Sequence, residues 1–377
     1  MPPKEILFGW LQHLRGASNR PGSPNILQLD LNSALDGIQI ERVNTGGFSG
    51  ARIWKVSNAA GNAWCLRRWP IGGPNREHLE WIHSQLFMAA AADVSFLSVP
   101  VSARPFGKTV IEFEGHFWEL SPWLIGVPVL NAGYECSAMK FAIEAAMEFH
   151  ASLDYSSHTS TSSKPRVSVS PALVQRERHL KRVEILLAQI RSAPRTGPLE
   201  IESGLVLDAM HAIGQRSGRL KSMAETLVHR KFRHRPVLSD LWCEHVLFDD
   251  GKVSGIIDYG SLCMDMLELP FARLVGSVFM LSGKLPIGEN FESDYHFESD
   301  YHEGWRLLQK TIEAGAKQIG LETEILDFLH QTNVILGCLN WLEWIFVQYR
   351  EFADPDRATN RARQMMKAAI ALSSEIR

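Results

Sequence analysis

A hairpin-forming stretch at residues 238–260 constrains the fold of this 377-residue chain more than any other part of it. The apolar run Val246–Phe248 leads into Asp249–Lys252, whose Asp-Asp-Gly-Lys sequence is typical of a tight β-turn, and a second apolar strand follows. Because a hairpin brings its two ends together, we expect Asp240, before the first strand, and Asp258, after the second, to converge.

Two converging carboxylates suit phosphoryl transfer. That reaction needs one group to orient the attacking hydroxyl and another to hold Mg²⁺ against the phosphates. We therefore consider Asp240 as a general base and Asp258 as a metal ligand. A purely structural interpretation stands beside this one, because Asp is common at the flanks of hairpins as a turn or capping residue.

The same stretch resembles the catalytic segment of the aminoglycoside phosphotransferase and choline kinase family, whose usual form is close to HGDLHxxNILFDDGxVxGIIDWG. Asp240 and Asp258 match its two aspartates without a gap. The resemblance implies that Asp240 is the catalytic-loop Asp and Asp258 the metal-binding Asp. It also implies ATP and Mg²⁺ as cofactors and a hydroxyl-bearing small molecule as acceptor.

Four positions depart from the family pattern: Leu238 replaces a His, Ser239 a Gly, Trp242 a second His, and His245 the metal-binding Asn. Imidazole is a poorer partner for Mg²⁺ than an oxygen is and a better one for softer metals, so Mn²⁺ is an alternative cofactor. His245 is either a second metal ligand or a residue that hydrogen-bonds Asp240 or the loop backbone. Both interpretations stay open.

The first third of the chain has the pattern of a mostly antiparallel sheet carrying one helix. Alternating or β-rich segments occupy residues 38–43, 51–56, 62–69, 109–113 and 116–120, and a helical pattern spans 75–91. Beyond residue 125 the chain is mainly helical. With the resemblance, this order implies an α+β, bilobal protein-kinase-like fold, with a small β-rich N-lobe over residues 1–124 that binds nucleotide and a larger, mainly helical C-lobe over residues 125–377.

A glycine-rich turn between the first two strands is the expected phosphate-covering loop. Gly46, Gly47 and Gly50 let backbone N–H groups approach phosphate oxygens, and Ser49 adds a hydroxyl. A Gly-Gly hairpin turn is common, so the assignment depends on the resemblance.

The third strand is expected to supply the cation for the phosphates. Arg67 and Arg68 are adjacent, and strand alternation lets only one of them point inward; we favour Arg67. A Glu on the following helix would hold that cation. Glu77 and Glu80 lie three residues apart on nearly one face, and we favour Glu80.

Composition excludes several classes of function. The net charge of −3 argues against a dedicated nucleic-acid binder, and no run of about 18 apolar residues predicts a membrane span. Five cysteines without paired spacing are typical of reduced thiols, so we expect a cytoplasmic protein. The sequence leaves the oligomeric state undetermined.

The sequence thus predicts an ATP-dependent phosphotransferase that moves the γ-phosphoryl group to a small-molecule hydroxyl. The replacements at Leu238 and His245 keep a kinase-fold pseudoenzyme as the alternative, and nucleotidyl transfer is a more remote one. The acceptor is expected among the C-terminal helices, where Trp341 and Trp344 form either core contacts or the wall of a pocket.

Overall fold

The computed structural model describes residues 2, 6–7, 9–10, 37–43, 50–103, 107–129, 136–159, 167–194, 198–282 and 321–374. They divide into two compact units. One contains Met1–Gly126 with Ser254–Gly260, and the other contains Val127–Val253 with Ser261–Arg377. In the division expected from sequence, Ser254–Gly260 falls in the C-lobe. In the structure, Ser254–Gly260 belongs to the N-terminal unit. One of its contacts there is the hydrogen bond from the N–H of Ile256 to the carbonyl of Phe96 at 3.0 Å.

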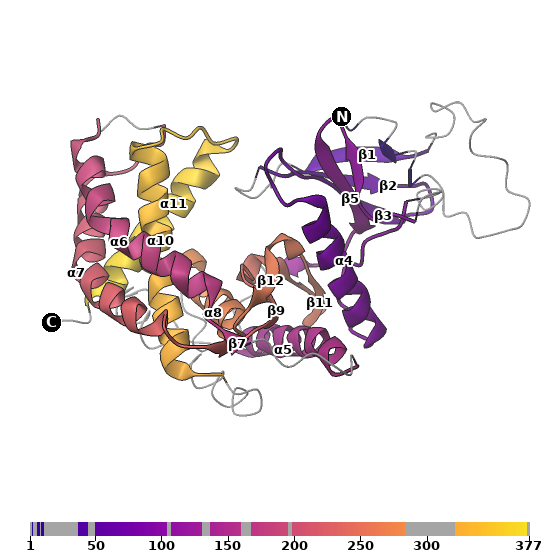
Figure 1. Ribbon diagram of the computed structural model, residues 1–377. Coiled ribbons are helices and arrows are strands. Elements are labelled where there is room, and N and C mark those ends of the chain that lie inside the picture. Colours follow the sequence, from indigo (N-terminus) through magenta and orange to yellow (C-terminus); the bar gives the residue numbers. More distant parts are fainter. Residues whose placement is uncertain are drawn as a thin grey trace, which may run out of the picture. The chain divides into compact units, whose positions relative to one another are not determined.

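The N-terminal unit is built on a five-stranded antiparallel sheet in the order β1-β2-β3-β5-β4 (Figure 1). Its strands are β1 (Gln39–Val43), β2 (Arg52–Ser57), β3 (Ala63–Arg68), β4 (Ile111–Phe113) and β5 (His116–Pro122). Apolar residues alternate along them, so Trp54, Leu66 and Leu120 share one buried face. The ring of Trp54 stacks on that of Trp118 at 5.4 Å between centroids.

Helix α4 (Arg76–Ala91) begins where the Asn75 side chain accepts the N–H of His78 at 2.8 Å. This is the capping contact that an Asn at the N-cap provides. Its buried residues Leu79, Ile82 and Leu86 recur at helical spacing. The expected order of three strands, one helix and two strands is confirmed.

The C-terminal unit is mainly helical. Its helices are α5 (Cys136–Thr159), α6 (Pro171–Ser192), α7 (Ser203–Leu227), α8 (Glu268–Ser282), α10 (Thr323–Phe346) and α11 (Pro355–Ser373). Helix α10 contacts α6, α7, α8 and α11 (Figure 1). Consecutive residues of α10, from Phe328 to Leu336, are buried, as in a helix that is surrounded on all sides.

Short strands and two 3₁₀ turns make up the segment that the sequence singled out together with the strands that pair near it. They are β6 (Val127–Pro128), β7 (Val167–Ser168), β8 (Phe232–Arg233), β9 (Arg235–Leu238), η2 (Cys243–His245), β10 (Val246–Asp249), β11 (Lys252–Ile256), η3 (Tyr259–Ser261) and β12 (Leu262–Asp265). The three-stranded sheet has the order β11-β10-β6, and β9 pairs with β12. Asp250 and Gly251 both have positive φ, +48° and +71°, as a two-residue hairpin turn requires. The predicted hairpin is confirmed.

No helix among the described residues is long and apolar enough to cross a membrane.

Candidate functional site

Arg67 of β3 lies beside two carboxylates of the N-terminal unit. Its Nη1 donates to Oδ1 of Asp258 at 2.9 Å, and its Nε lies 3.7 Å from Oε1 of Glu119. The pairing of β3 with β5 sets Arg67 directly opposite Glu119. Its side chain is largely buried, and the guanidinium carbon is 4.9 Å from the ring centre of Trp69. One buried guanidinium is therefore shared by two carboxylates.

The neighbouring Arg68 points to the other face of the sheet, as strand alternation requires. Its guanidinium lies 5.9 Å from the ring of Trp118, and burial together with Arg52 and Arg42 lowers its pKa. Of the two adjacent arginines, Arg67 is thus the one that faces Asp258.

A histidine of α4 completes the Arg67 group. His83 is almost fully buried, and its Nε2 donates to Oε2 of the ionised Glu119 at 2.9 Å. Its Nδ1 lies 2.7 Å from the hydroxyl of Thr109. Burial raises the pKa of Glu119, but His83 and Arg67 outweigh that effect and hold it below the ordinary value. Glu119 is therefore an anion that fixes the position of Arg67.

The expected pairing of Arg67 with Glu80 is wrong. Glu80 faces solvent and lies 3.7 Å from Arg76, one turn earlier on the same helix. Sequence reasoning missed Glu119 and His83. For Glu119, the local signal was that it alternates with the apolar Trp118 and Leu120. Its position opposite Arg67 depends on the strand register, which no local pattern gives.

Asp258 follows β11 with a φ of +65°, in the left-handed region that non-glycine residues seldom adopt. The adjoining Tyr259 is buried, and its hydroxyl donates to the carbonyl of Ile256, which fixes the turn. The side chain of Asp258 is 43% exposed, so one strained residue presents a partly exposed carboxylate next to Arg67.

In the C-terminal unit, Asp240 lies in a loop that hydrogen bonds to Ser261 hold in place. Its N–H donates to Oγ of Ser261 at 3.0 Å, and the hydroxyl of Ser239 donates to the carbonyl of Ser261 at 2.9 Å. The indole N–H of Trp242 donates to Oδ1 of Asp240 at 2.8 Å, and Nε of Arg273 lies 3.0 Å from the same oxygen as an ion-pair partner. Half of the Asp240 side chain remains exposed.

Trp242 connects Asp240 to two guanidinium groups. Those of Arg273 and Arg361 lie 5.1 and 5.3 Å from its ring centre, within the range of cation–π contacts. Arg361 also donates to Glu244 at 2.7 Å. The tryptophan that replaces the family's second His therefore orients the Asp240 carboxylate.

His245 forms hydrogen bonds with the backbone of its own loop. Its Nδ1 accepts the N–H of Trp242 at 3.4 Å, and its own N–H donates to the carbonyl of the same residue at 2.9 Å. Of the two open interpretations, this geometry favours bracing of the loop backbone over metal binding. The described residues contain no group of three or more side chains that could hold a metal ion.

A buried histidine supports the loop at Leu238, where the family pattern has a His. Nε2 of His150, on α5, accepts the N–H of Leu238 at 3.1 Å, and its Nδ1 lies 2.6 Å from the carbonyl of Ala146. Burial lowers the pKa of His150 to about 4, so it is neutral at pH 7. The imidazole comes from another element, 88 residues earlier in the chain.

Gly46, Gly47 and Ser49 lie outside the described residues. Gly50, the last of the expected phosphate-loop residues, has a φ of +79°, which suits glycine. The convergence of Asp240 with Asp258 concerns residues of different units and stays a prediction.

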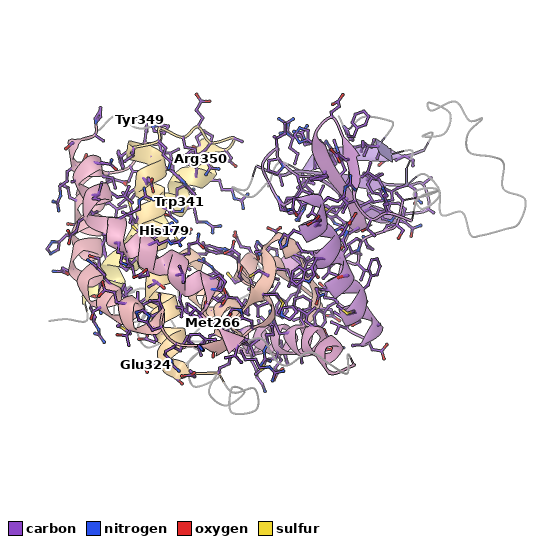
Figure 2. The ribbon with its side chains drawn as sticks, viewed as in Figure 1. His179, Met266, Glu324, Trp341, Tyr349 and Arg350 are labelled. Atoms are coloured by element: carbon purple, nitrogen blue, oxygen red, sulfur yellow. The ribbon has the colours of Figure 1, made fainter. Side chains whose placement is uncertain are left out.

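Trp341 makes core contacts. It is 5% exposed and stacks on Phe352 at 5.5 Å, with Trp344 edge-on at 5.3 Å. Figure 2 shows Trp341, Tyr349 and Arg350 toward the same end of α10, and the guanidinium of Arg350 lies 4.6 Å from the Trp344 ring. The aromatic pair is therefore a packed cluster.

The fold of the chain is similar to those of solved phosphotransferases. The chain resembles a spectinomycin phosphotransferase solved with ADP and spectinomycin (10% identity, TM-score 0.57, 100% of this chain and 99% of that one). It also resembles choline kinase from Cryptosporidium parvum Iowa II (11%, 0.53, 99% of both chains) and aminoglycoside phosphotransferase from Alicyclobacillus acidocaldarius (11%, 0.53, 94% and 95%). These likenesses confirm the protein-kinase-like fold class.

No curated protein matches the chain in sequence. The model of the family described as the phosphotransferase enzyme family matches residues 40–308, which include β3, the hairpin and both aspartates. The chain therefore belongs to the phosphotransferase enzyme family.

Proposed function

We propose that the protein transfers the γ-phosphoryl group of ATP to a hydroxyl of a small molecule. The observation that carries the proposal is the group formed by Arg67, Asp258 and Glu119, in which a largely buried guanidinium lies against a partly exposed carboxylate. Family membership supports the same reaction, and two similar structures hold nucleotide: the spectinomycin phosphotransferase with ADP and an amicoumacin kinase with AMP-PNP.

In this proposal Arg67 binds phosphate oxygens of the nucleotide. A guanidinium suits this role because its planar fork stays charged and matches phosphate geometry. Glu119 and His83 keep the side chain in place, so little of its rotamer entropy is lost when the nucleotide binds. We expect the nucleotide to gain affinity from an arginine that is already positioned.

Mg²⁺ fits the residues present. Asp258 offers a partly exposed carboxylate, the oxygen donor that Mg²⁺ prefers, and the remaining ligands would be phosphate oxygens and water. When bound, the ion neutralises charge that develops on the phosphates. We assign no metal-binding role to His245, whose Nδ1 accepts the backbone N–H of Trp242.

Asp240 orients the acceptor hydroxyl and accepts its proton. The acceptor oxygen forms a bond to the γ-phosphorus, the bond from that phosphorus to the ADP oxygen breaks, and the proton passes to Oδ of Asp240. Trp242 and Arg273 hold Oδ1, which leaves Oδ2 to face the hydroxyl. The carboxylate is thus oriented before the acceptor arrives.

The proposal is tested by thermal shift with ATP, with and without Mg²⁺, on the wild type and on Asp258→Asn. We expect a Mg²⁺-dependent rise in Tm that the variant loses. Glu80→Gln is the matched control, since Glu80 lies on the neighbouring helix and does not contact Arg67. No shift of the wild-type Tm under either condition would refute the proposal, and a shift without any turnover would favour the pseudoenzyme alternative.

A further inference from the structure

Among the residues that the structure describes, no carboxylate forms an ion pair with Arg176 of α6. Its Nη2 donates to Oδ1 of Asn333 at 2.8 Å, its Nε to the hydroxyl of Thr332 at 3.2 Å, and its Nη1 to the carbonyl of Ala172 at 3.3 Å. All three acceptors are neutral. Arg176 is partly buried, and a partly desolvated guanidinium that makes no ion pair is suited to bind an anion.

Arg176 also lies in the electrostatic field of the Asp240 loop. Burial and then the charge of Arg273 lower its pKa to about 10, while Asp265 and Asp240 oppose that effect. Arg176 is therefore still charged at pH 7. The charges that act on Arg176 include Arg273, the arginine that pairs with the proposed base, so the two arginines lie in the same part of the C-terminal unit.

Asn333 adds an unused donor next to Arg176. Its side chain is 4% exposed, its oxygen accepts from Arg176, and its amide nitrogen has no hydrogen-bond partner. The orientation of the amide is fixed, because the flipped form would set two donors against each other. A buried amide N–H₂ without an acceptor costs free energy that a bound oxygen would recover.

The nearby carboxylates are already satisfied. Asp265 accepts the N–H groups of Ala172 and Met266 at 3.0 and 2.8 Å, and Glu244 pairs with Arg361. Asp240 pairs with Arg273. Apart from Oδ2 of Asp240, which the proposed transfer step uses, these carboxylates offer no uncommitted oxygen to a cationic acceptor, whereas an anionic oxygen would find a guanidinium and an amide donor.

We infer that the acceptor carries an anionic oxygen group, a carboxylate or a phosphate, and that Arg176 and Asn333 bind this group while Asp240 receives the hydroxyl. The inference rests on the proposed function for the transfer step, but the binding of the anion can be measured without it. Arg273 makes the arrangement compatible with a negatively charged base, because it offsets the charge of Asp240.

Helix α6 offers a matched control. Arg182 lies six residues beyond Arg176, is exposed, and is 3.7 Å from Glu343. Figure 2 labels His179, which lies midway between these two arginines on the same helix. Arg182→Gln removes the same charge as Arg176→Gln without touching Asn333. Asn333→Asp is a second variant that keeps Arg176 and gives it an internal carboxylate.

The test measures Tm without nucleotide in the presence of two matched sets of compounds. One set is glycerate and glycerol 3-phosphate against glycerol and 3-aminopropane-1,2-diol; the other is glucuronate and glucose 6-phosphate against glucose and glucosamine. We expect Tm to rise only with anionic members. A response to glycerate and glucuronate alone identifies a carboxylate group, and a response to the two phosphates alone identifies a phosphate group.

Arg176→Gln and Asn333→Asp should weaken that binding about tenfold or more, and Arg182→Gln should leave it unchanged. The Mg²⁺-ATP shift, measured on the same variants, should be unaffected. The inference is overturned if no anion raises the wild-type Tm, if binding survives both variants, or if ATP phosphorylates only neutral or cationic members. Loss of the ATP shift in the wild type would instead refute the proposed function.

Discussion

The two aspartates of the hairpin segment have opposite electrostatic surroundings. Asp258, in the sheet-containing unit, shares a single guanidinium with Glu119. Asp240, in the helical unit, lies in a group where the guanidiniums of Arg176, Arg273 and Arg361 face only two carboxylates in direct ion pairs, those of Asp240 and Glu244. The first group has one more carboxylate than guanidinium. In the second, Asp265 also acts on Arg176, so the charges of the three guanidiniums and three carboxylates balance, but Arg176 makes no direct ion pair.

The groups around Asp258 and Asp240 suit different parts of the proposed reaction. We expect surplus carboxylate to attract a divalent cation, and with it the phosphates, and a guanidinium that makes no direct ion pair to attract an anionic acceptor. Each aspartate is ion-paired with one arginine, so pairing alone does not distinguish them. The side chains around each ion pair distinguish the two aspartates. Glu119 and His83 lie next to the pair of Asp258, and Trp242 and Arg361 lie next to the pair of Asp240.

The variant Asp240→Asn tests most directly whether the two aspartates have separate roles. Asparagine keeps the shape and still accepts the indole N–H of Trp242, but it cannot take a proton. We expect turnover to fall by about 10²- to 10⁴-fold with ATP affinity unchanged. ADP release and calorimetric titration with Mg²⁺-ATP measure the two quantities. If Asp240→Asn weakened ATP binding as much as Asp258→Asn does, the two aspartates would not have separate roles.

Removal of the shared guanidinium should have the next largest effect. Arg67→Met leaves Glu119, which is 15% exposed, without its cation, and we expect the free energy of unfolding to fall by about 3 kcal/mol. The double variant Arg67→Met/Glu119→Gln should recover part of the loss. Chemical denaturation measures both variants. Glu80→Gln, which disturbs an exposed pair, should change stability by less than about 1 kcal/mol; an equal loss in that control would contradict the assignment.

The support of the Asp240 loop should depend on pH. The pKa of His150 is lowered from 6.5 to about 4 by burial, so between these values the unfolded chain binds more protons than the folded one. The contribution of His150 to the free energy of unfolding therefore has its full value above pH 6.5. It falls by about 3 kcal/mol in total as the pH drops to 4.

Denaturation at several pH values measures this slope. His150→Gln should flatten it, at the cost of a lower stability at pH 7. An unchanged slope in the variant would mean that the acid sensitivity between pH 4 and 6.5 does not arise from His150.

The smallest effect is expected for Trp242→Phe. Phenylalanine keeps a ring for the two guanidiniums and removes only the indole N–H that Asp240 accepts. Loss of one such hydrogen bond is worth about 1 kcal/mol, so turnover should fall by about fivefold. Trp242→Ala, which also removes the ring, should cost more. Equal losses in the two variants would show that the indole N–H does not contribute.

Local patterns were sufficient for much of the fold and part of the site. The Asp-Asp-Gly-Lys turn, the strand order and the helix from Asn75 follow from turn chemistry, alternation and capping, and all are found in the structure. The orientation of Arg67 relative to Arg68 follows from alternation as well. These features depend on residues within a few positions of one another.

The partners of the functional residues depended on the tertiary structure. Arg67 is held by Glu119 because β3 and β5 pair in one register, and a shift of one residue would set a different side chain opposite it. His150 reaches Leu238, and Arg361 reaches Trp242, across separations of about 90 and 120 residues. The sequence by itself predicted the two aspartates and Arg67 as the residues proposed to carry the chemistry, and it predicted the elements that bear them. Only packing between distant elements decided what holds each of them, because register and helix docking are set by many contacts that no local motif contains.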